Sequence, residues 1–255
     1  VYGGPGVQNV MNTWAGTWEN FHQVLARDGY IVFSLDNRGS GERGVRFESA
    51  LHMRLGSVEV DDQKAGVEFL RTLPEVDPQR IGIMGWSYGG YMALMCTLRA
   101  PEHFAAGVAG APVSDWRLYD THYTERYMST PQANTAGYDA SDVLTYTGKL
   151  SRPLLLIHGM ADDNVLFTHS TVVMQALQQK FGIANAGELL VAMGHTAGLS
   201  LQETVFDPGY FYVTTQEAQG AAWVLAKLGM NLTDNIFFGM ENGIPSPLAN
   251  PVLIP

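Results

Sequence analysis

One serine has the neighbours of a catalytic nucleophile. Ser87 stands in the stretch GWSYGG, where Gly85, Gly89 and Gly90 surround it. The frame Gly-x-Ser-x-Gly suits a tight turn that strains the serine backbone and exposes the hydroxyl. With 28 glycines among 255 residues, this frame arises by chance only about 0.1 times per chain. An apolar run precedes Ser87 and a helical pattern follows it, so the context predicts a nucleophile at the end of a strand.

A nucleophilic serine needs a base, and the base needs an acid to orient it. The apolar run at 152–157 is followed by Asp162 and Asp163, and either carboxylate would lie at the carboxyl end of a strand. Of the seven histidines, only His195 lies beyond these acids and just after another candidate strand. The order serine, acid, histidine predicts a Ser-Asp-His triad.

The other candidate groups favour structural roles. We expect His158, at the end of a strand, to be packed and hydrogen-bonded, and His169 to lie on the surface of a helix. A metal site built from these two histidines and Asp162 lacks a recognised ligand spacing, so we expect no metal and no other cofactor. Cys96 lies in an apolar run and is expected to be a buried, inert thiol.

A second motif suggests a different function. The stretch GSGERG at 39–44 matches the dinucleotide fingerprint Gly-x-Gly-x-x-Gly. However, residues 36–38 separate it from the preceding apolar run, and no helix opens within it. Dinucleotide binding would also leave Ser87, Asp162 and His195 unexplained, so we favour the hydrolase interpretation.

The scaffold that must position these groups alternates strands and helices. Nearly continuous apolar runs predict strands at residues 30–36, 80–86, 104–113, 152–159 and 187–193. Helical patterns cover residues 18–29, 59–73, 88–100 and 168–182. This alternation predicts an α/β fold, a mostly parallel sheet with helices on both faces, as in α/β hydrolases. The helix at 59–73 should bury one apolar face, formed by Val60, Val67, Leu70 and Leu73, and its acidic first turn suits the helix dipole.

Two regions depart from the alternation. Residues 114–150 form a long insertion rich in Tyr, Asp and Thr, and such insertions are usually functional or disordered. Residues 230–255 contain four prolines and little periodicity, and we expect an irregular tail. We therefore assign residues 1–229 to one catalytic domain.

Composition excludes several functions. The net charge of −10 argues against nucleic-acid and anionic-membrane partners. No apolar run approaches the length of a membrane span. The single cysteine excludes an internal disulfide but leaves the compartment open, because the cytoplasm and the bacterial periplasm or exterior are both compatible with it. The chain starts at Val1 inside an apolar stretch, so we expect a piece of a longer protein.

Seven motifs in order resemble one known family. They are VYGGPG, DNRGSGERG, RLGSVEVDDQ, GWSYGGYM, APVSDW, YTERYM and HGMADDNV, from residue 1 to about residue 167. Together they resemble the catalytic domain of the prolyl oligopeptidase clan, in its dipeptidyl peptidase IV branch. After about residue 182 the resemblance fades.

The resemblance implies a role for individual residues. Ser87 matches the nucleophile, and Asp162 matches the triad acid. The hydroxyl of Tyr2 and the backbone N–H of Tyr88 match the oxyanion hole. Two polar residues match groups that hold a substrate carbonyl, namely Arg126 and Asn164. Six residues match the apolar pocket for the residue before the scissile bond, namely Tyr88, Val113, Trp116, Tyr119, Tyr123 and Val165.

The implied activity is release of dipeptides after proline or alanine from the N-termini of peptide substrates. In the family an N-terminal β-propeller, absent from this chain, supplies the acidic groups that bind the substrate amine. That propeller is therefore an expected partner, and a homodimer through the hydrolase domain stays open. The alternatives are an esterase or acylaminoacyl peptidase with the same triad, or an inactive interaction domain.

Overall fold

The computed structural model describes residues 1–13, 17–159 and 162–181 and four short strands beyond them. The described helices are α1 (Thr17–Arg27), α2 (Val45–Glu48), η1 (Ser49–Leu51), α3 (Val58–Leu70), α4 (Tyr88–Arg99), η2 (Trp116–Leu118), α5 (Thr121–Met128), α6 (Thr135–Ser141), η3 (Val143–Lys149) and α7 (Thr168–Phe181). The described strands are β1 (Gly82–Trp86), β2 (Ala106–Gly110), β3 (Leu154–Ile157), β4 (Thr204–Asp207), β5 (Tyr210–Val213), β6 (Phe238–Glu241) and β7 (Ile244–Pro247).

The central sheet consists of β1, β2 and β3 in that order, all parallel. Trp86 pairs with Gly110, and Gly110 pairs with Ile157. The carboxyl ends of the three strands are therefore level, as the α/β prediction requires. The three strands lie inside the predicted runs at 80–86, 104–113 and 152–159.

Helix α4 packs against β1 and β2 and is buried on nearly all sides, because its residues from Tyr88 to Leu98 are almost all apolar. Small residues in β2 allow this close approach. A Cβ atom added at Gly107 would collide with the side chain of Thr97 on α4, and one at Gly110 would collide with the Trp86 indole. Gly107 thus sets the distance between α4 and the sheet, and Gly110 leaves room for the Trp86 ring of the neighbouring strand β1.

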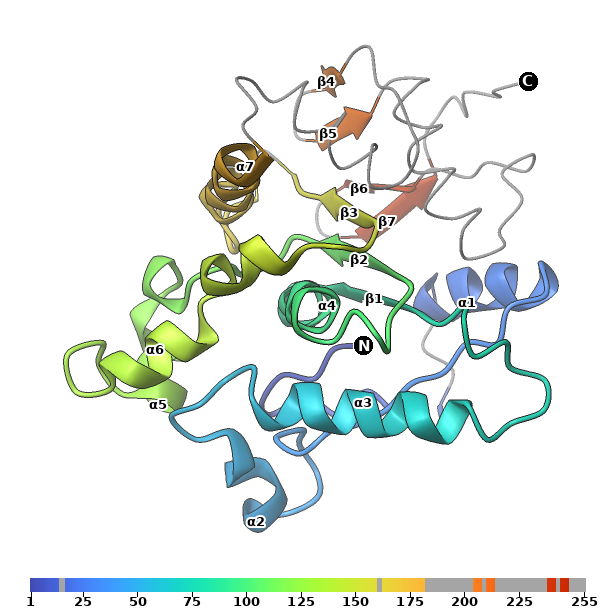
Figure 1. Ribbon diagram of the computed structural model, residues 1–255, viewed down its shortest axis with the longest axis horizontal. Coiled ribbons are helices and arrows are strands. Elements are labelled where there is room, and N and C mark those ends of the chain that lie inside the picture. The colour runs from blue at the N-terminus through green and yellow to red at the C-terminus, as the bar shows by residue number, and fades with distance from the viewer. Residues whose placement is uncertain are drawn as a thin grey trace.

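The remaining helices complete the layers. In Figure 1, α4 and α7 lie on one side of the three strands and α1 lies toward the other side. Helix α3 packs beside α4 and buries the expected Val60, Val67 and Leu70. Helix α1 ends as predicted before Gly29, which has a φ of 90° that favours glycine. All four predicted helices are confirmed.

The predicted strand at residues 30–36 is wrong. No ladder pairing involves this segment among the described residues, and Ile31, Val32 and Phe33 are 53%, 38% and 39% exposed. An apolar run predicts a buried strand only if another strand lies beside it. Here the segment packs on α3 through two side chains, since Leu35 and Phe33 both lie close to Gly66. The strand predicted at 187–193 lies outside the described residues.

Other sequence expectations have mixed outcomes. The insertion at 114–150 is folded into η2, α5, α6 and η3. Within residues 230–255 the structure describes only β6 and β7, which pair antiparallel, and the irregular tail stays a prediction. The assignment of residues 1–229 to one domain stays a prediction. The motif at 39–44 leads only into α2, a helix of four residues, so the long helix of a dinucleotide site does not follow it.

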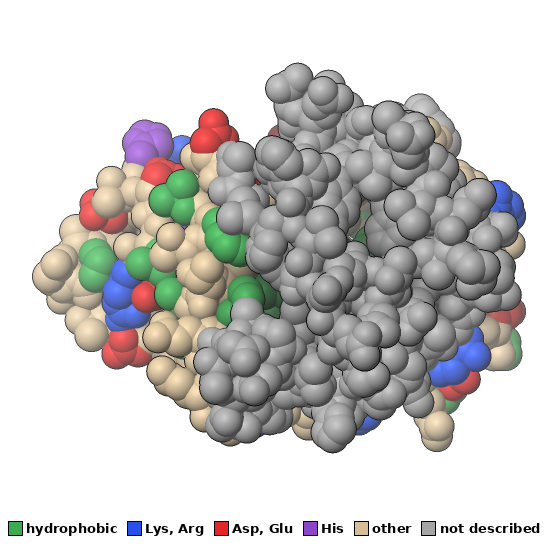
Figure 2. Space-filling model, turned by 90° about the horizontal axis from the view of Figure 1, so that it is seen from above, with side chains coloured by type: hydrophobic (Ala, Val, Ile, Leu, Met, Phe, Trp, Pro, Cys, Tyr) green, Lys and Arg blue, Asp and Glu red, His purple; other side chains and the backbone are tan. Residues whose placement is uncertain are grey.

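The described helices include none that is long and apolar enough to cross a membrane. On the described part of the face in Figure 2, acidic and basic side chains are interspersed and do not gather into a patch of one sign. The net charge of −10 is therefore not concentrated on that visible part.

Candidate active site

Ser87 occupies a strained turn between β1 and α4. Its φ of 59° and ψ of −118° lie in a region that L-residues rarely adopt, at a cost of about 1–3 kcal/mol. The Ser87 N–H donates to the Gly110 carbonyl over 2.9 Å, and the Tyr91 N–H donates to the Ser87 carbonyl over 3.0 Å. These bonds hold the strained residue at the first turn of α4, with its side chain half-buried. This is the strand–turn–helix geometry predicted for a nucleophile.

The glycines around Ser87 are required by close contacts of the backbone. A Cβ atom at Gly85 would lie 2.6 Å from the Val1 carbonyl oxygen, and one at Gly89 would collide with the same oxygen. A Cβ atom at Gly90 would collide with the Gly110 carbonyl. Glycine is therefore required at these positions because the N-terminal segment and β2 contact the turn there.

Tyr2 reaches the turn through the same contacts. The backbone nitrogen of Val1 donates to the Met84 carbonyl over 2.7 Å, which places Tyr2 beside the turn. The Tyr2 ring lies 6.0 Å from the Tyr88 ring, measured between centroids, and is half-buried. Burial raises the pKa of the Tyr2 phenol, so it stays a proton donor at neutral pH. The structure thus brings the two predicted oxyanion residues together.

Asp162 is the better positioned of the two candidate acids. Its Oδ1 accepts the N–H groups of Asn164 and Val165 over 3.0 and 2.9 Å, whereas Asp163 is exposed. The Asp162 Oδ2 lies 3.7 Å from Nε2 of His158. The loop therefore fixes the Asp162 carboxylate, as an orienting acid requires.

Ser87 and Asp162 lie at the same edge of the sheet. Ser87 follows β1 directly, and Asp162 follows β3 by five residues, with β2 between them. Two strand spacings amount to about 10 Å, a gap that a histidine ring and the loop after β3 can span. His195, the predicted base, lies outside the described residues.

His158 is packed and hydrogen-bonded, as predicted. Its Nδ1 lies 2.7 Å from the Ser170 hydroxyl, its Nε2 lies 2.7 Å from the Val165 carbonyl, and burial lowers its pKa. Both ring nitrogens are therefore engaged inside the fold. This arrangement makes His158 a poor base for Ser87.

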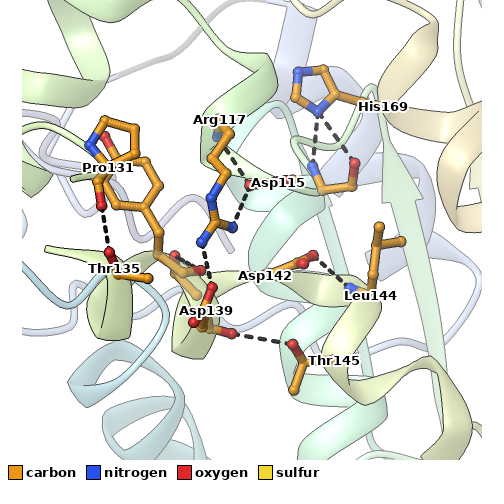
Figure 3. A network of polar contacts seen from close by, with 12 residues as sticks. Asp115, Arg117, Pro131, Thr135, Asp139, Asp142, Leu144, Thr145 and His169 are labelled. Carbon is orange, nitrogen blue, oxygen red and sulfur yellow. Dashed lines mark hydrogen bonds and ion pairs between the residues drawn. The ribbon is translucent and has the colours of Figure 1, made fainter.

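His169 does not lie on the surface, contrary to the prediction, because it is fully buried in α7. Its Nδ1 accepts the Ser114 N–H over 3.1 Å (Figure 3). Burial lowers the pKa of His169 to about 4. The helical position was predicted correctly, but the partner on the insertion could not be read from local sequence.

Cys96 is buried, as predicted, and burial raises the pKa of its thiol to about 12. Such a thiol is not a nucleophile at neutral pH.

The predicted pocket residues form one aromatic cluster. Trp116 stacks on Tyr123 with ring centroids 6.0 Å apart and contacts Tyr88 at 5.3 Å and Tyr119 at 5.8 Å. Val113 and Val165 are buried in the core that these rings join. Since Tyr88 adjoins Ser87, the cluster lies next to the candidate nucleophile.

The two polar residues predicted to hold a substrate carbonyl differ in position. The Asn164 Oδ1 accepts the Tyr119 hydroxyl over 3.0 Å, which joins the acid loop to the aromatic cluster. Arg126 is exposed and stands over the Tyr127 ring, 5.8 Å from its centroid. Tyr127 in turn packs edge-on against Tyr123 at 5.0 Å. Arg126 thus lies at the outer side of the cluster.

A polar network holds the insertion that carries these rings (Figure 3). Arg117 forms ion pairs with Asp115 and Asp139, and its guanidinium lies 5.3 Å from the centroid of the Tyr138 ring. The Asp142 side chain caps η3 by accepting the Leu144 N–H over 2.8 Å. Trp116 therefore lies between Asp115 and Arg117, whose side chains are held by ion pairs.

One buried acid near the nucleophile was not identified from the sequence. Glu59, read as a dipole-favoured first-turn acid of a helix, is fully buried, and its Oε1 accepts the Tyr88 hydroxyl over 2.8 Å. Burial raises the pKa of Glu59. Its place in the mostly apolar face of α3 was the available signal, because Val60 and Val67 are buried on the same helix.

Comparisons with known proteins identify the family of this chain. A family model described as the prolyl oligopeptidase family matches residues 18–198. This chain belongs to the prolyl oligopeptidase family. Membership confirms the predicted α/β-hydrolase fold.

Individual proteins similar to this chain include dipeptidyl peptidases. Human dipeptidyl peptidase 8 is 44% identical over 181 residues, which cover 69% of this chain and 20% of that protein. The crystal structure of Porphyromonas gingivalis dipeptidyl peptidase 4 matches with a TM-score of 0.67 and 44% identity, over 72% of this chain and 26% of that one. A solved structure from Bacteroides ovatus gives a TM-score of 0.69 and 45% identity, over 71% of this chain and 26% of that chain. The family member thus matches only about a fifth to a quarter of each relative.

Proposed function

We propose that this chain is the catalytic region of a dipeptidyl peptidase that cleaves after proline or alanine through Ser87, Asp162 and His195. The observation that carries the proposal is the strained Ser87 at the first turn of α4. A non-glycine residue held at a φ of 59° is costly, and such strain clusters at functional sites. Family membership and the names of the relatives give the reaction class.

In this proposal His195 takes the proton of the Ser87 hydroxyl as the oxygen attacks the substrate carbonyl. Asp162 holds the imidazole and stabilises its positive charge. His195 then returns the proton to the leaving amine, and water hydrolyses the acyl-enzyme by the same steps. The family match extends to residue 198 and so includes His195.

The oxyanion is proposed to bind the backbone N–H of Tyr88 and the hydroxyl of Tyr2. The first N–H groups of a helix are free of helical partners, and the helix dipole favours negative charge there. The closeness of the Tyr2 and Tyr88 rings supports this pairing. One such donor is worth about 3 kcal/mol to the transition state.

The aromatic cluster is proposed to receive the residue before the scissile bond. A proline side chain is compact, rigid and apolar, and the flat rings of Trp116, Tyr119 and Tyr123 offer it contact area at little entropic cost. Asn164 and Arg126 would hold a substrate carbonyl beside the cluster. Recognition of the free amine is assigned to the β-propeller region of the longer relatives.

A fluorophosphonate probe tests the nucleophile directly. We expect wild-type protein to be labelled, Ser87→Ala to lose the label, and Ser49→Ala, which changes an exposed serine, to keep it. His195→Gln should slow labelling by about a thousandfold or more, whereas His122→Gln, at an exposed position, should not. Labelling that survives Ser87→Ala would contradict the proposal, and no labelling of folded wild type would favour an inactive interaction domain.

Substrate choice separates the peptidase from its rivals. Hydrolysis of a Gly-Pro anilide, measured against a short-chain p-nitrophenyl ester and an acetyl-alanyl anilide, reports the preferred class. We expect the Gly-Pro anilide to have the highest kcat/KM. A higher value for the ester or the acetylated substrate would assign an esterase or an acylaminoacyl peptidase.

A further inference from the structure

Helix α3 buries two polar side chains one turn apart. Glu59 is 0% exposed and Gln63 is 8% exposed, although they share the face that packs into the core. Residues four apart on a helix lie above one another. A buried polar group costs free energy unless it is hydrogen-bonded, so the contacts of this pair indicate why the helix retains it.

Glu59 connects α3 to the residue after the nucleophile. Its Oε1 accepts the Gly56 N–H over 2.7 Å and the Tyr88 hydroxyl over 2.8 Å. The Tyr88 ring is 2% exposed, so its hydroxyl points into the core and away from solvent. The Glu59 Oε2 has no hydrogen-bond partner among the described residues. One oxygen of Glu59 therefore fixes Tyr88, whose backbone begins α4.

Gln63 connects the same face to the N-terminal segment. Its Nε2 donates to Oδ1 of Asn37 over 3.0 Å, and Nδ2 of Asn37 donates to the Gly3 carbonyl over 2.9 Å. Asn37 is 1% exposed, so these bonds are shielded from water. Gly3 is the residue after Tyr2, and it has a φ of 82° that favours glycine. The chain of bonds ends beside Tyr2.

We propose that Glu59 and Gln63 are positioning residues that hold the two halves of the oxyanion site, Tyr88 and Tyr2, in register with Ser87. The inference rests on the proposed function, because that function assigns the oxyanion donors. It adds that one helix aligns two donors that are 86 residues apart in the chain. Helix α3 is suited to this task because it packs directly on α4.

The test compares matched substitutions in the full 255-residue chain. Glu59→Leu and Gln63→Met remove the bonding groups at similar volume, and Glu59→Gln keeps an acceptor oxygen. Glu68→Gln makes the same chemical change on the exposed side of α3, where the Glu68 side chain is 57% exposed. Circular dichroism and melting temperature establish that each variant is folded.

We expect Glu59→Leu and Gln63→Met to lower kcat on a Gly-Pro anilide by about tenfold to a hundredfold, since small misplacements of reacting groups cost about that much. KM should change by less than about threefold, because an oxyanion donor acts in the transition state. Glu59→Gln should recover much of the loss, and Glu68→Gln should match wild type. Fluorophosphonate labelling should slow in parallel with kcat.

A double-mutant cycle tests the path of the effect. If Glu59 acts through the Tyr88 hydroxyl, Glu59→Leu should add little to the loss of Tyr88→Phe. Additive losses, or a kcat within twofold of wild type for folded Gln63→Met and Glu59→Leu, would overturn the inference. Those outcomes would leave the proposed function intact, whereas folded wild type that is neither labelled nor active would overturn both.

Discussion

The turn at residues 85–90 and the insertion at 114–150 border the same candidate site but are held in different ways. The turn is fixed by its backbone, because glycine contacts and the hydrogen bond to Gly110 leave Ser87 one conformation. The insertion is fixed by side chains, through the ion pairs of Arg117 and the helix cap at Asp120. Backbone contacts tolerate almost no substitution, whereas side-chain contacts can be removed one by one.

The difference assigns different duties to the two regions. A nucleophile must be held within a fraction of an ångström, and the main-chain contacts of the turn supply that precision. The insertion carries Trp116, Tyr119 and Tyr123, which in the proposed function only shape a pocket. We therefore expect changes in the turn to reduce kcat and changes in the insertion to raise KM.

The largest effect should come from Gly89→Ala. The added Cβ atom collides with the Val1 carbonyl oxygen, which is backbone and cannot rotate away. We expect the turn to shift and fluorophosphonate labelling to fall by more than about a hundredfold. Gly148→Ala is the control, because an added Cβ atom there meets nothing within 4 Å. Full labelling of Gly89→Ala would show that the turn is less constrained than its contacts indicate.

Trp116→Ala should have the next largest effect. Trp116 is 1% exposed and its ring contacts Tyr88, Tyr119 and Tyr123, so its loss leaves a cavity worth about 3–5 kcal/mol of unfolding free energy. Leu118→Ala, 40% exposed in the same short helix, should cost less than about 0.5 kcal/mol. Denaturant unfolding measures both. A small loss for Trp116→Ala would mean that the insertion is stable without its aromatic centre.

The fold was predictable where the signal is local. The runs at 80–86, 104–113 and 152–159 contain the three central strands, and the helical periods gave α1, α3, α4 and α7. The run at 30–36 failed because apolar content does not reveal whether a partner strand is present. Strand pairing depends on two segments, and the apolar pattern of one segment gives no information about the other.

The site was predictable where covalent neighbours determine it. Gly85 and Gly89 lie two residues before and after Ser87 in the motif, and this local pattern is sufficient to predict the turn. Glu59 and His169 were misjudged because their partners, Tyr88 and Ser114, are 29 and 55 residues away. Local sequence predicts that a polar residue on a helix is exposed, because it does not show the hydrogen-bond partner that the fold brings to it.

A smaller effect is expected from acid. His169 is neutral in the fold, with a pKa lowered to about 4 by burial and by His158, and Asp115 and Asp162 oppose the shift. Its unfolded pKa is about 6.5, so between pH 6.5 and 4 the unfolded chain binds more protons. Stability is therefore full above pH 6.5 and falls as the pH drops toward 4.

His169→Gln should flatten this dependence, because an amide oxygen can accept the Ser114 N–H without a proton. Between pH 7 and pH 4.5, the melting temperature of wild type should fall by several degrees more than that of His169→Gln. His122→Gln, at an exposed position, should keep the wild-type slope. Comparing variants at each pH removes the contribution of other groups such as Glu59, whose pKa burial raises. Parallel curves for wild type and His169→Gln would contradict this prediction.

The smallest effect should follow from Asp120→Ala. Oδ1 of Asp120 caps α5 by accepting the Tyr123 N–H over 2.8 Å, and loss of such a cap costs about 1 kcal/mol. Asp120→Asn keeps the acceptor and should restore most of the stability. Because α5 carries Tyr123 into the proposed pocket, the alanine variant should raise KM for a Gly-Pro anilide slightly and leave kcat unchanged. A fall in kcat instead would mean that the insertion also controls the reacting groups, and the division of duties between it and the turn would be wrong.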